Sequence, residues 1–520
     1  MNFLILWGIG MSKVKNVTKY SMLITIILVL SKMTGFIREA IVAAVLGASR
    51  QSDIFKLSSS MPNVLFSFIA AGLTTSFIPV FSDIKNDKEK SKAFFNKIIN
   101  IIALICLVVA VIGIIFAKPL VIAFASGFDR SQIDIVVYYT RILMPSIVFL
   151  GVSGLYTGYL QAKGIFLQPA LTGIAANFVV IIGLLVFKGY GLMPAIISVF
   201  ISAIAQLLIQ APFAKEHKYE FIIDFKDQYV KRMLLLSIPT IISCIIAQLN
   251  SMVSTNFASN FGPGSISVID YASKTSSLIN QVFIVSITTV LYPTLTEKFS
   301  SGSKEEFEDT FVKSIDYVSI VAMPLTFGVS VLSKPIVQVL LERGDFDANA
   351  TALTASVLSI LAFLALANSY FDILGKVFFA SKNTLTPMIN GILSVIITVV
   401  LMFILAPKYK IEGIAIALTL AMAIIVVIMY IELKSKFKGL DTKKILFNLS
   451  KILLSAVIMS IVTKYSYDIL TSINSSESKI YLLVKMSIST LLSAAVYAVS
   501  LIVLKVDTAK DVLKIFKRSK

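Results

Sequence analysis

A charged segment interrupts the first long apolar stretch of the chain. In SKMTGFIRE, the residues Ser31, Gly35 and Arg38 are spaced i, i+4 and i+7 and share one face of a helix. Lys32 and Glu39 lie with Gly35 on an adjoining face. Two cations against one carboxylate favour an anion-binding site, and Gly35 leaves room for a ligand or a close helix. The alternative is a pair of Glu39 with Lys32 or Arg38 near the outer membrane interface.

Three more charged residues lie in apolar stretches further along the chain. Asp270 and Lys274 are spaced i, i+4, which permits either a local salt bridge or a place on the wall of a cleft. Arg141, in YYTRILMP, lies about two turns into another expected helix. Ionisable groups at membrane depth usually face a water-filled cavity or a partner. We therefore treat Lys274 as a candidate binding residue, and Arg141 and Asp270 as secondary candidates.

The sequence lacks the residues that metal binding, disulfide formation or enzyme catalysis would need. His217 is the single histidine, and Cys106 and Cys244 lie inside apolar runs, so we expect neither a metal site nor a disulfide framework. The sequence contains no P-loop, no HExxH motif and no loop that carries catalytic carboxylates. We therefore expect a transporter, with no catalytic residues and no bound cofactor. Its drive would be a sodium ion, a proton or the membrane potential.

The composition indicates the elements that must position these side chains. Of the 520 residues, 57% are apolar and 15% are charged, whereas soluble domains carry about 25% charged residues. A membrane-spanning helix needs roughly 20 apolar residues. The apolar runs are continuous, as over 98–117, and do not alternate as barrel strands would. The sequence therefore predicts an all-α polytopic membrane protein.

Polar and Gly/Pro-bearing loops divide the chain into about fourteen expected transmembrane helices. Their approximate limits are 20–47, 60–83, 92–117, 133–161, 166–187, 190–213, 231–258, 264–296, 309–333, 348–380, 386–406, 411–433, 446–467 and 480–504.

The distribution of lysine and arginine predicts the orientation of these helices. Most of these residues fall in alternate loops, which places both termini in the cytoplasm. The net charge of +18 is then explained by cytoplasmic lysines that face anionic lipids, and we expect no nucleic-acid partner. The first ten residues lack a basic segment and a small-residue cleavage site, so we do not expect a cleaved signal peptide. Translation starts at Met1 or at Met11.

An internal repeat predicts the domain organisation. Gly47 is followed by Pro79 in FIPVF, and Gly262 is followed at almost the same spacing by Pro293 in LYPTL. Each glycine follows an odd-numbered helix and each proline ends an even-numbered one. Such parallel repeats in transporters enclose a central cleft, here expected between the first, second, seventh and eighth helices. The expected parts are a six-helix lobe over 20–213, a second six-helix lobe over 231–433, and two additional helices over 446–504.

Several motifs in order resemble those of a known family. SKMTGFIREAIVAAVLGASRQSDIF and MPNVLFSFIAAGLTTSFIPVFSD are followed by the segments 140–171, 260–274 and 381–387. Together they resemble the MurJ (MviN) family of lipid II flippases, within the multidrug/oligosaccharidyl-lipid/polysaccharide exporter superfamily. The resemblance covers essentially the whole chain.

The resemblance implies a function in peptidoglycan biosynthesis. Members of the family move lipid II, the undecaprenyl-pyrophosphate-linked precursor, from the inner to the outer leaflet of the bacterial cytoplasmic membrane. Cationic side chains of the cleft hold the pyrophosphate, and the two extra helices form a groove for the lipid tail. The implied partners are lipid II or a related polyprenyl-pyrophosphate glycolipid, anionic membrane lipids and the cell-wall synthesis machinery. The matching binding positions are Ser31, Lys32, Gly35, Arg38, Glu39, Asp53, Asn63 and Lys274.

The chain departs from the family pattern at several of the charged positions. Phe66 and Ser67 stand where the family usually has one or two arginines, and Ala71 stands in place of an acid. Phe66 is therefore expected to make one wall of the cleft apolar. Lys32 and Lys274 replace arginines, which keeps the charge but loses the bidentate fork.

These departures leave other cargoes open. The alternatives are a flippase for another polyprenyl-linked glycan or a drug exporter of the same superfamily. An exporter of organic cations would need a buried acid without a cationic excess, which Lys32 and Arg38 oppose. A non-transporting membrane scaffold would not need charges in a cleft, and a membrane glycosyltransferase would need a catalytic loop with carboxylates.

Overall fold

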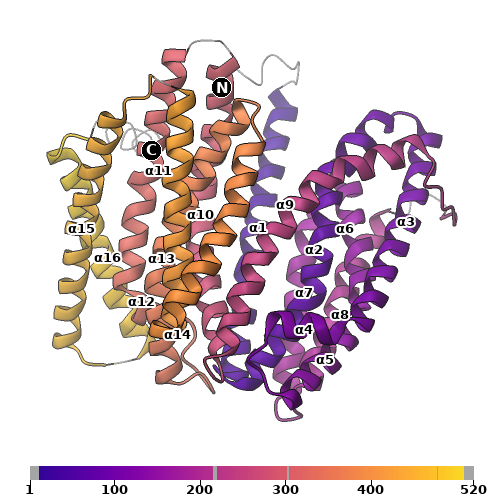
Figure 1. The fold of residues 1–520 in the computed structure, drawn as a ribbon, viewed down its shortest axis with the longest axis horizontal. Helices are drawn as coiled ribbons and strands as arrows, with labels where there is room; N and C mark the ends of the chain where they lie inside the picture. The colour runs from indigo at the N-terminus through magenta and orange to yellow at the C-terminus, as the bar shows by residue number, and fades with distance from the viewer. Residues whose placement is uncertain are drawn as a thin grey trace. The chain divides into compact units, whose positions relative to one another are not determined.

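The computed structural model describes residues 11–214, 219–300, 304–437, 439–476, 478–506 and 508. Within these residues the chain is built of helices and contains no β-strand, which confirms the all-α class (Figure 1). The first ten residues and His217 lie outside the described residues, so the predictions about the start of translation and the cytoplasmic termini are not tested.

The chain divides into two compact units. The first contains the described residues up to Leu46 together with Arg50–Gln248, and the second contains Gly47–Ser49 and the described residues from Leu249 onward. The helices of the first unit are α1 (Met11–Leu46), α2 (Arg50–Ile84), α3 (Lys88–Ile115), α4 (Ala117–Phe124), α5 (Arg130–Leu143), α6 (Ser146–Ala162), α7 (Leu167–Val186), α8 (Met193–Gln210) and the short 3-10 helix η2 (Ala211–Ala214).

The boundary between the units falls within a helix, α9 (Gln228–Ser259). The second unit continues with α10 (Ser265–Ser300), α11 (Lys304–Val331), α12 (Ser333–Leu340), α13 (Ala348–Ala380), α14 (Leu385–Lys436), α15 (Thr442–Ile473) and α16 (Lys479–Val503). The grouping into two six-helix lobes and two added helices stays a prediction.

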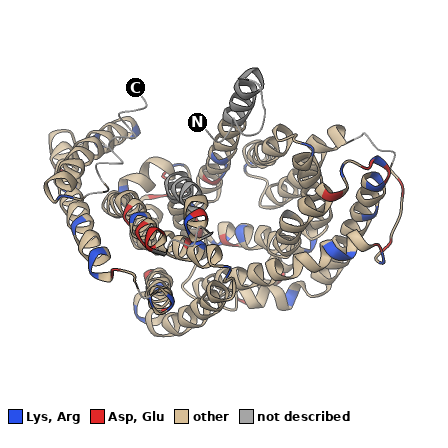
Figure 2. Ribbon diagram, turned by 90° about the horizontal axis from the view of Figure 1, so that it is seen from above, with Lys and Arg blue, Asp and Glu red and all other residues tan. Residues whose placement is uncertain are grey.

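Most of the long helices have the length and composition of membrane spans. In the part of the chain that the structure describes, ten helices are long and apolar enough to cross a membrane, or up to eleven if α5 and α6, bent by 43°, form one span. Pro145 lies at this bend, where its missing N–H interrupts the helical ladder. Figure 2 shows that uncharged residues make up most of each helix. Large apolar side chains stay exposed, such as Phe403 at 68%, which suits contact with lipid.

The structure differs in three ways from the helices that hydropathy predicts. The two expected helices over 386–406 and 411–433 form the single long element α14, which breaks at Lys410, where φ is 51° and ψ is −126°. The eight-residue helices α4 and α12 were not expected, and each follows directly on a long helix. The third difference matters for the site: α2 begins at Arg50, well before the predicted start at residue 60.

The first unit is held together by aromatic packing and close helix crossings. The ring of Phe95 lies 4.2 Å from the ring of Tyr159, and Phe77 stacks on Phe81 at 5.4 Å. α1 packs along α7, and α2 packs along α5 and α6. α7 and α8 cross so closely that a β-carbon on Gly183 would overlap the β-carbon of Ser198. Small residues at such crossings let helices approach in a membrane, where no hydrophobic effect drives them together.

A polar segment before α9 is bound to the surface of α3. The Lys97 ammonium lies 3.0 Å from an Asp224 carboxylate oxygen and 2.8 Å from one of Asp227. The Asn100 amide donates to the carbonyl oxygens of Glu220 and Ile222. The hydrogen bond from Lys97 lowers the pKa of Asp224 below its ordinary value of 3.8, so this carboxylate stays charged at neutral pH.

In the second unit, the core lies between α10, α11, α13 and α14, and the last two helices pack beside it. Phe307, Phe311 and Phe437 are almost completely buried there. α15 packs along α11 and α16, and the Tyr497 hydroxyl of α16 donates to the carbonyl oxygen of Ile320 at 2.9 Å (Figure 1).

Candidate anion-binding site on α1 and α2

The small residues of the α1 motif are occupied by contact with α7. A β-carbon on Gly35 would lie 3.4 Å from the Asn177 amide nitrogen, and one on Gly173 would overlap the Ser31 hydroxyl. The Asn177 amide donates to the Thr34 hydroxyl at 3.1 Å and to the Ser31 carbonyl at 3.4 Å. Of the two uses considered for Gly35, a ligand or a close helix, the structure shows the close helix. Ser31 and Gly35 therefore help to fix the rotation of α1.

Two charged residues of the motif, Arg38 and Glu39, form an ion-pair network with a residue of α2. One Glu39 carboxylate oxygen accepts a hydrogen bond from Arg38 at 2.7 Å, and the other accepts one from the Lys56 ammonium at 3.1 Å. The Glu39 and Lys56 side chains are only 9% and 8% exposed, whereas that of Arg38 is 33% exposed. The pair of Arg38 with Glu39, considered as an alternative to anion binding, is thus present, but Arg38 also keeps an accessible surface.

Lys32 and Asn63 present polar groups at the surface of the same unit. Lys32 is exposed on α1, one turn before Gly35. Asn63 is exposed on α2, and its amide donates to the Ser59 carbonyl oxygen at 2.8 Å.

Asp53 lies completely buried at the start of α2. An Arg50 guanidinium nitrogen lies 3.8 Å from an Asp53 carboxylate oxygen, and the same guanidinium stacks over the Phe128 ring at 4.4 Å. Nearby, Asp129 caps α5, and the backbone N–H of Gln132 lowers the pKa of its carboxyl, with a smaller effect from the Arg50 charge. Asp53 is therefore positioned to orient Arg50, and its assignment as a binding residue stays a prediction.

Phe66 and Ser67 have packing contacts within the first unit. A β-carbon on Gly154 of α6 would lie 3.6 Å from the Phe66 ring, so the ring lies against α6. The Ser67 hydroxyl accepts a hydrogen bond from the Gln248 amide of α9 at 3.1 Å. The expected role of Phe66 as a wall of the cleft therefore stays a prediction, while its contact with α6 is established.

Arg141 has a structural role at the end of α3. Its Nε donates to the Ile114 carbonyl oxygen at 3.2 Å, and its side chain is otherwise exposed. The last carbonyl groups of a helix have no partner within the helix, and a basic side chain can satisfy them. This contact does not bring Arg141 to the ion-pair network of α1.

The remaining two candidates lie in the second unit. The Lys274 ammonium of α10 is 2.9 Å from an Asp270 carboxylate oxygen, and both side chains are partly exposed. This geometry confirms the local salt bridge that the i, i+4 spacing permits.

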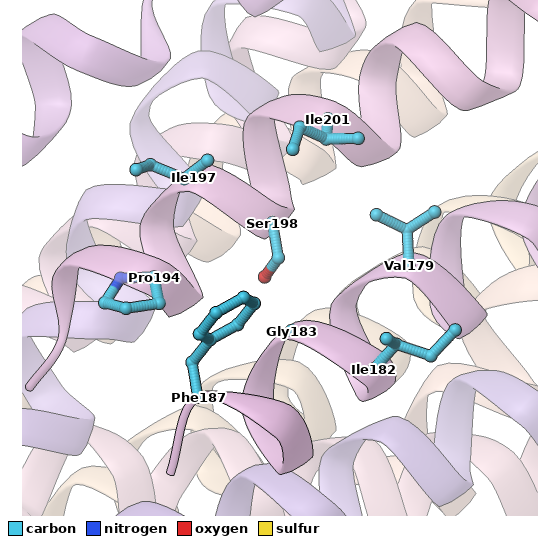
Figure 3. Close-up of a pocket in the computed structure, with 8 residues that line it drawn as sticks. All are labelled: Val179, Ile182, Gly183, Phe187, Pro194, Ile197, Ser198 and Ile201. Carbon is cyan, nitrogen blue, oxygen red and sulfur yellow. The ribbon is translucent and has the colours of Figure 1, made fainter. Parts of the chain in front are cut away.

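An apolar groove between α7 and α8 offers a different kind of surface. It has a volume of about 400 Å³. Figure 3 shows its lining, which consists of Val179, Ile182, Gly183, Phe187, Pro194, Ile197, Ser198 and Ile201. The Ser198 hydroxyl donates to the Ala195 carbonyl oxygen within its own helix. The groove therefore offers hydrocarbon contact and no charge, and it cannot hold a pyrophosphate. Across the described ranges, no group of three or more His, Cys, Asp or Glu side chains could hold a metal ion.

Comparison with known proteins decides the family. The family described as "Lipid II flippase MurJ" matches residues 42–484, most of the chain. The chain belongs to the MurJ family. A probable lipid II flippase MurJ of Rickettsia prowazekii (strain Madrid E) is 27% identical over 443 residues, which cover 83% of this chain and 87% of the relative. The lipid II flippase MurJ of Burkholderia cenocepacia (strain J2315) is 26% identical over 422 residues, which cover 78% and 82%.

Solved structures show the same fold. A lipid II flippase MurJ in an inward closed conformation matches with a TM-score of 0.78 and 24% identity, over 93% of this chain and 99% of that one. An inward-facing MATE family multidrug transporter of the MOP superfamily matches with a TM-score of 0.67 and 13% identity, over 79% and 95%. The fold of this chain is thus similar to the folds of both of these solved transporters.

Lys56 is a residue of the ion-pair network that the sequence pattern does not reveal. The segment 50–59 is polar and was expected to be a loop, because hydropathy marks only the part of a helix that lies in hydrocarbon. The structure continues α2 through this segment, which carries Lys56 to Glu39 of α1. The available signal was the spacing of Asp53 and Lys56, which is that of one helical turn.

Proposed function

We propose that this chain is a flippase that moves lipid II from the inner to the outer leaflet of a bacterial cytoplasmic membrane by alternating access. Membership in the MurJ family and the shared fold support the proposal. The observation that carries it is the charge arrangement on α1. Arg38 keeps a surface that is 33% exposed, although its carboxylate partner is nearly buried. The exposed part of the Arg38 guanidinium offers N–H donors beyond its pair with Glu39, and an anionic cargo can accept hydrogen bonds from them.

The chemistry of the cargo explains why cations are needed. An isolated charge in hydrocarbon costs many kcal/mol, so a pyrophosphate cannot cross the bilayer bare. A wet cleft that carries Lys32, Arg38 and Lys274 would replace the hydration of the phosphates. Arg38 would supply a bidentate contact, whereas the two lysines supply point charges that remain strongly hydrated and favour release. Lys274 would bind the cargo either while it keeps its salt bridge to Asp270 or after that salt bridge has broken.

The proposed cycle assigns roles to the parts of the chain. The lobes 20–213 and 231–433 would rock about the bound headgroup, as in other transporters built from repeats. The helices in 446–504 would hold the lipid tail outside the cleft, and both termini would lie in the cytoplasm. The drive would be a coupled sodium ion or proton, or the membrane potential, which supplies about 2.3 kcal/mol per charge per 100 mV. Anionic lipids and cell-wall synthesis enzymes are the expected neighbours.

A replacement experiment tests this function. The cell's own lipid II flippase is depleted while this chain is supplied, and growth is expected to continue. Purified protein in liposomes should also move fluorescent lipid II to the outer leaflet, with the surface variant Lys118→Met as a control that leaves transport unchanged. If the protein inserts correctly but the cells do not grow, and the protein transports a different polyprenyl-linked glycan, that glycan is the cargo. Transport of organic cations alone would make the chain a drug exporter.

A further inference from the structure

We propose that Lys56 is a positioning residue for the cargo: its ammonium neutralises the Glu39 carboxylate and thereby preserves the positive charge of Arg38 for the pyrophosphate. The inference rests on the proposed function and names a member of the same site that neither the motif nor the family match assigns. Lys56 would not touch the cargo. It would act through Glu39, on which Arg38 depends for its orientation.

Arg38 and Lys56 differ in whether a ligand can contact them. Each holds a different oxygen of the one carboxylate, Arg38 at 2.7 Å and Lys56 at 3.1 Å. The Lys56 side chain is 8% exposed and that of Arg38 is 33% exposed. A ligand as large as a pyrophosphate can therefore contact the guanidinium but not the ammonium. Lys56 belongs to α2 and Glu39 to α1, so the pair also links two helices of the same unit.

The charges explain why the second cation matters. An arginine paired with a glutamate carries no net charge, and an approaching anion is repelled by the carboxylate nearly as strongly as it is attracted by the guanidinium. With Lys56 included, the three side chains carry one net positive charge. The carboxylate also accepts a charge-assisted hydrogen bond from each side, which limits its rotation and that of the guanidinium bound to it. Both effects favour binding of an anion at the exposed edge of Arg38.

Charge variants of Lys56 and Glu39 test the proposal, because a purely structural role of Lys56 predicts a different result for the double variant. Replacing Lys56 by methionine leaves Arg38 to balance the charge of Glu39 without the second cation, and the affinity for lipid II is expected to fall by roughly five- to ten-fold. Lys56→Arg keeps the charge and is expected to keep most of the affinity. The double variant Lys56→Met, Glu39→Gln removes one charge of each sign and is expected to regain most of the lost affinity, although the link between the helices is then missing.

The measurements separate this inference from the proposed function. Dissociation constants are measured for lipid II and for inorganic pyrophosphate, and initial rates of flipping are recorded over a range of lipid II concentrations. The half-saturating concentration should rise in Lys56→Met, while the maximal rate changes little. Lys118→Met, which removes a cation from an exposed pair with Asp134, is the matched control and should leave affinity unchanged.

Three results would refute either the proposed function or the role of Lys56. Wild-type protein that neither binds nor flips lipid II would refute the proposed function. A wild-type protein that is active, with Lys56→Met of equal affinity, would refute only the role of Lys56. The same holds if the double variant is no better than Lys56→Met and both melt at a lower temperature, because Lys56 would then act as a structural link.

Discussion

Replacement of Arg38 by alanine is the most direct perturbation of the proposed site. A charge-assisted hydrogen bond contributes about 1.5–3 kcal/mol, so the loss of one contact to a phosphate should weaken lipid II binding by roughly ten- to a hundred-fold. Arg38→Lys keeps the charge without the bidentate fork and should fall between wild type and alanine. Affinity in nanodiscs and flipping in liposomes measure the effect.

The same substitution should hardly change the stability of the fold. The Arg38 side chain is 33% exposed and pairs with the adjacent residue in sequence, and such partly solvated pairs contribute about 0–1 kcal/mol. Glu39 also keeps its contact with Lys56 at 3.1 Å, so no buried carboxylate is left without a cation. The midpoint of thermal unfolding should therefore shift by no more than a few degrees.

A double variant tests whether Arg38 binds the cargo or only balances the charge of the Glu39 carboxylate. Arg38→Ala combined with Glu39→Gln removes both charges but retains a polar side chain beside Lys56. If Arg38 binds the cargo, transport should stay impaired in this variant. Recovery of wild-type transport would show that the arginine only compensated Glu39, and the assignment of Arg38 to the pyrophosphate would be wrong.

Two further predictions concern packing and a loop. Gly183→Ala should destabilise the protein by about 1–3 kcal/mol, because the new β-carbon would overlap that of Ser198. Gly375→Ala, whose β-carbon would meet nothing within 4 Å, should be neutral or stabilising by up to about 1 kcal/mol; equal melting temperatures for both variants would contradict this difference. Because the pKa of Asp224 lies below its ordinary value of 3.8 in the folded protein, its ion pair with Lys97 stabilises the loop fully at any pH above that value. This stabilisation is lost only when the pH falls through the lower pKa of the folded state. Proteolysis of the loop should therefore be constant from pH 8 to 5 in wild type and faster in Lys97→Met, and a steep rise of the wild-type rate within that range would refute the ion pair.

Hydropathy predicted the class of the fold because the bilayer imposes a local rule. Every spanning segment must be apolar and satisfy its own backbone groups, which only a continuous helix does here. The predicted spans therefore correspond to long helices of the structure, including the bent pair α5 and α6 and the two halves of α14. Where a helix extends beyond the hydrocarbon, the rule does not apply, and the start of α2 was missed for that reason.

The sequence by itself determined that this is an all-α membrane protein, which residues carry charge within its helices, and the family to which its motifs point. Only the tertiary structure decided what those residues contact. Gly35 meets Asn177 of α7, Arg141 caps α3, and Glu39 joins Lys56 of α2. Each contact joins positions far apart in the chain or in different helices. In a bilayer, lipid and protein neighbours are equally apolar, so the pattern within one helix does not tell which face meets which partner.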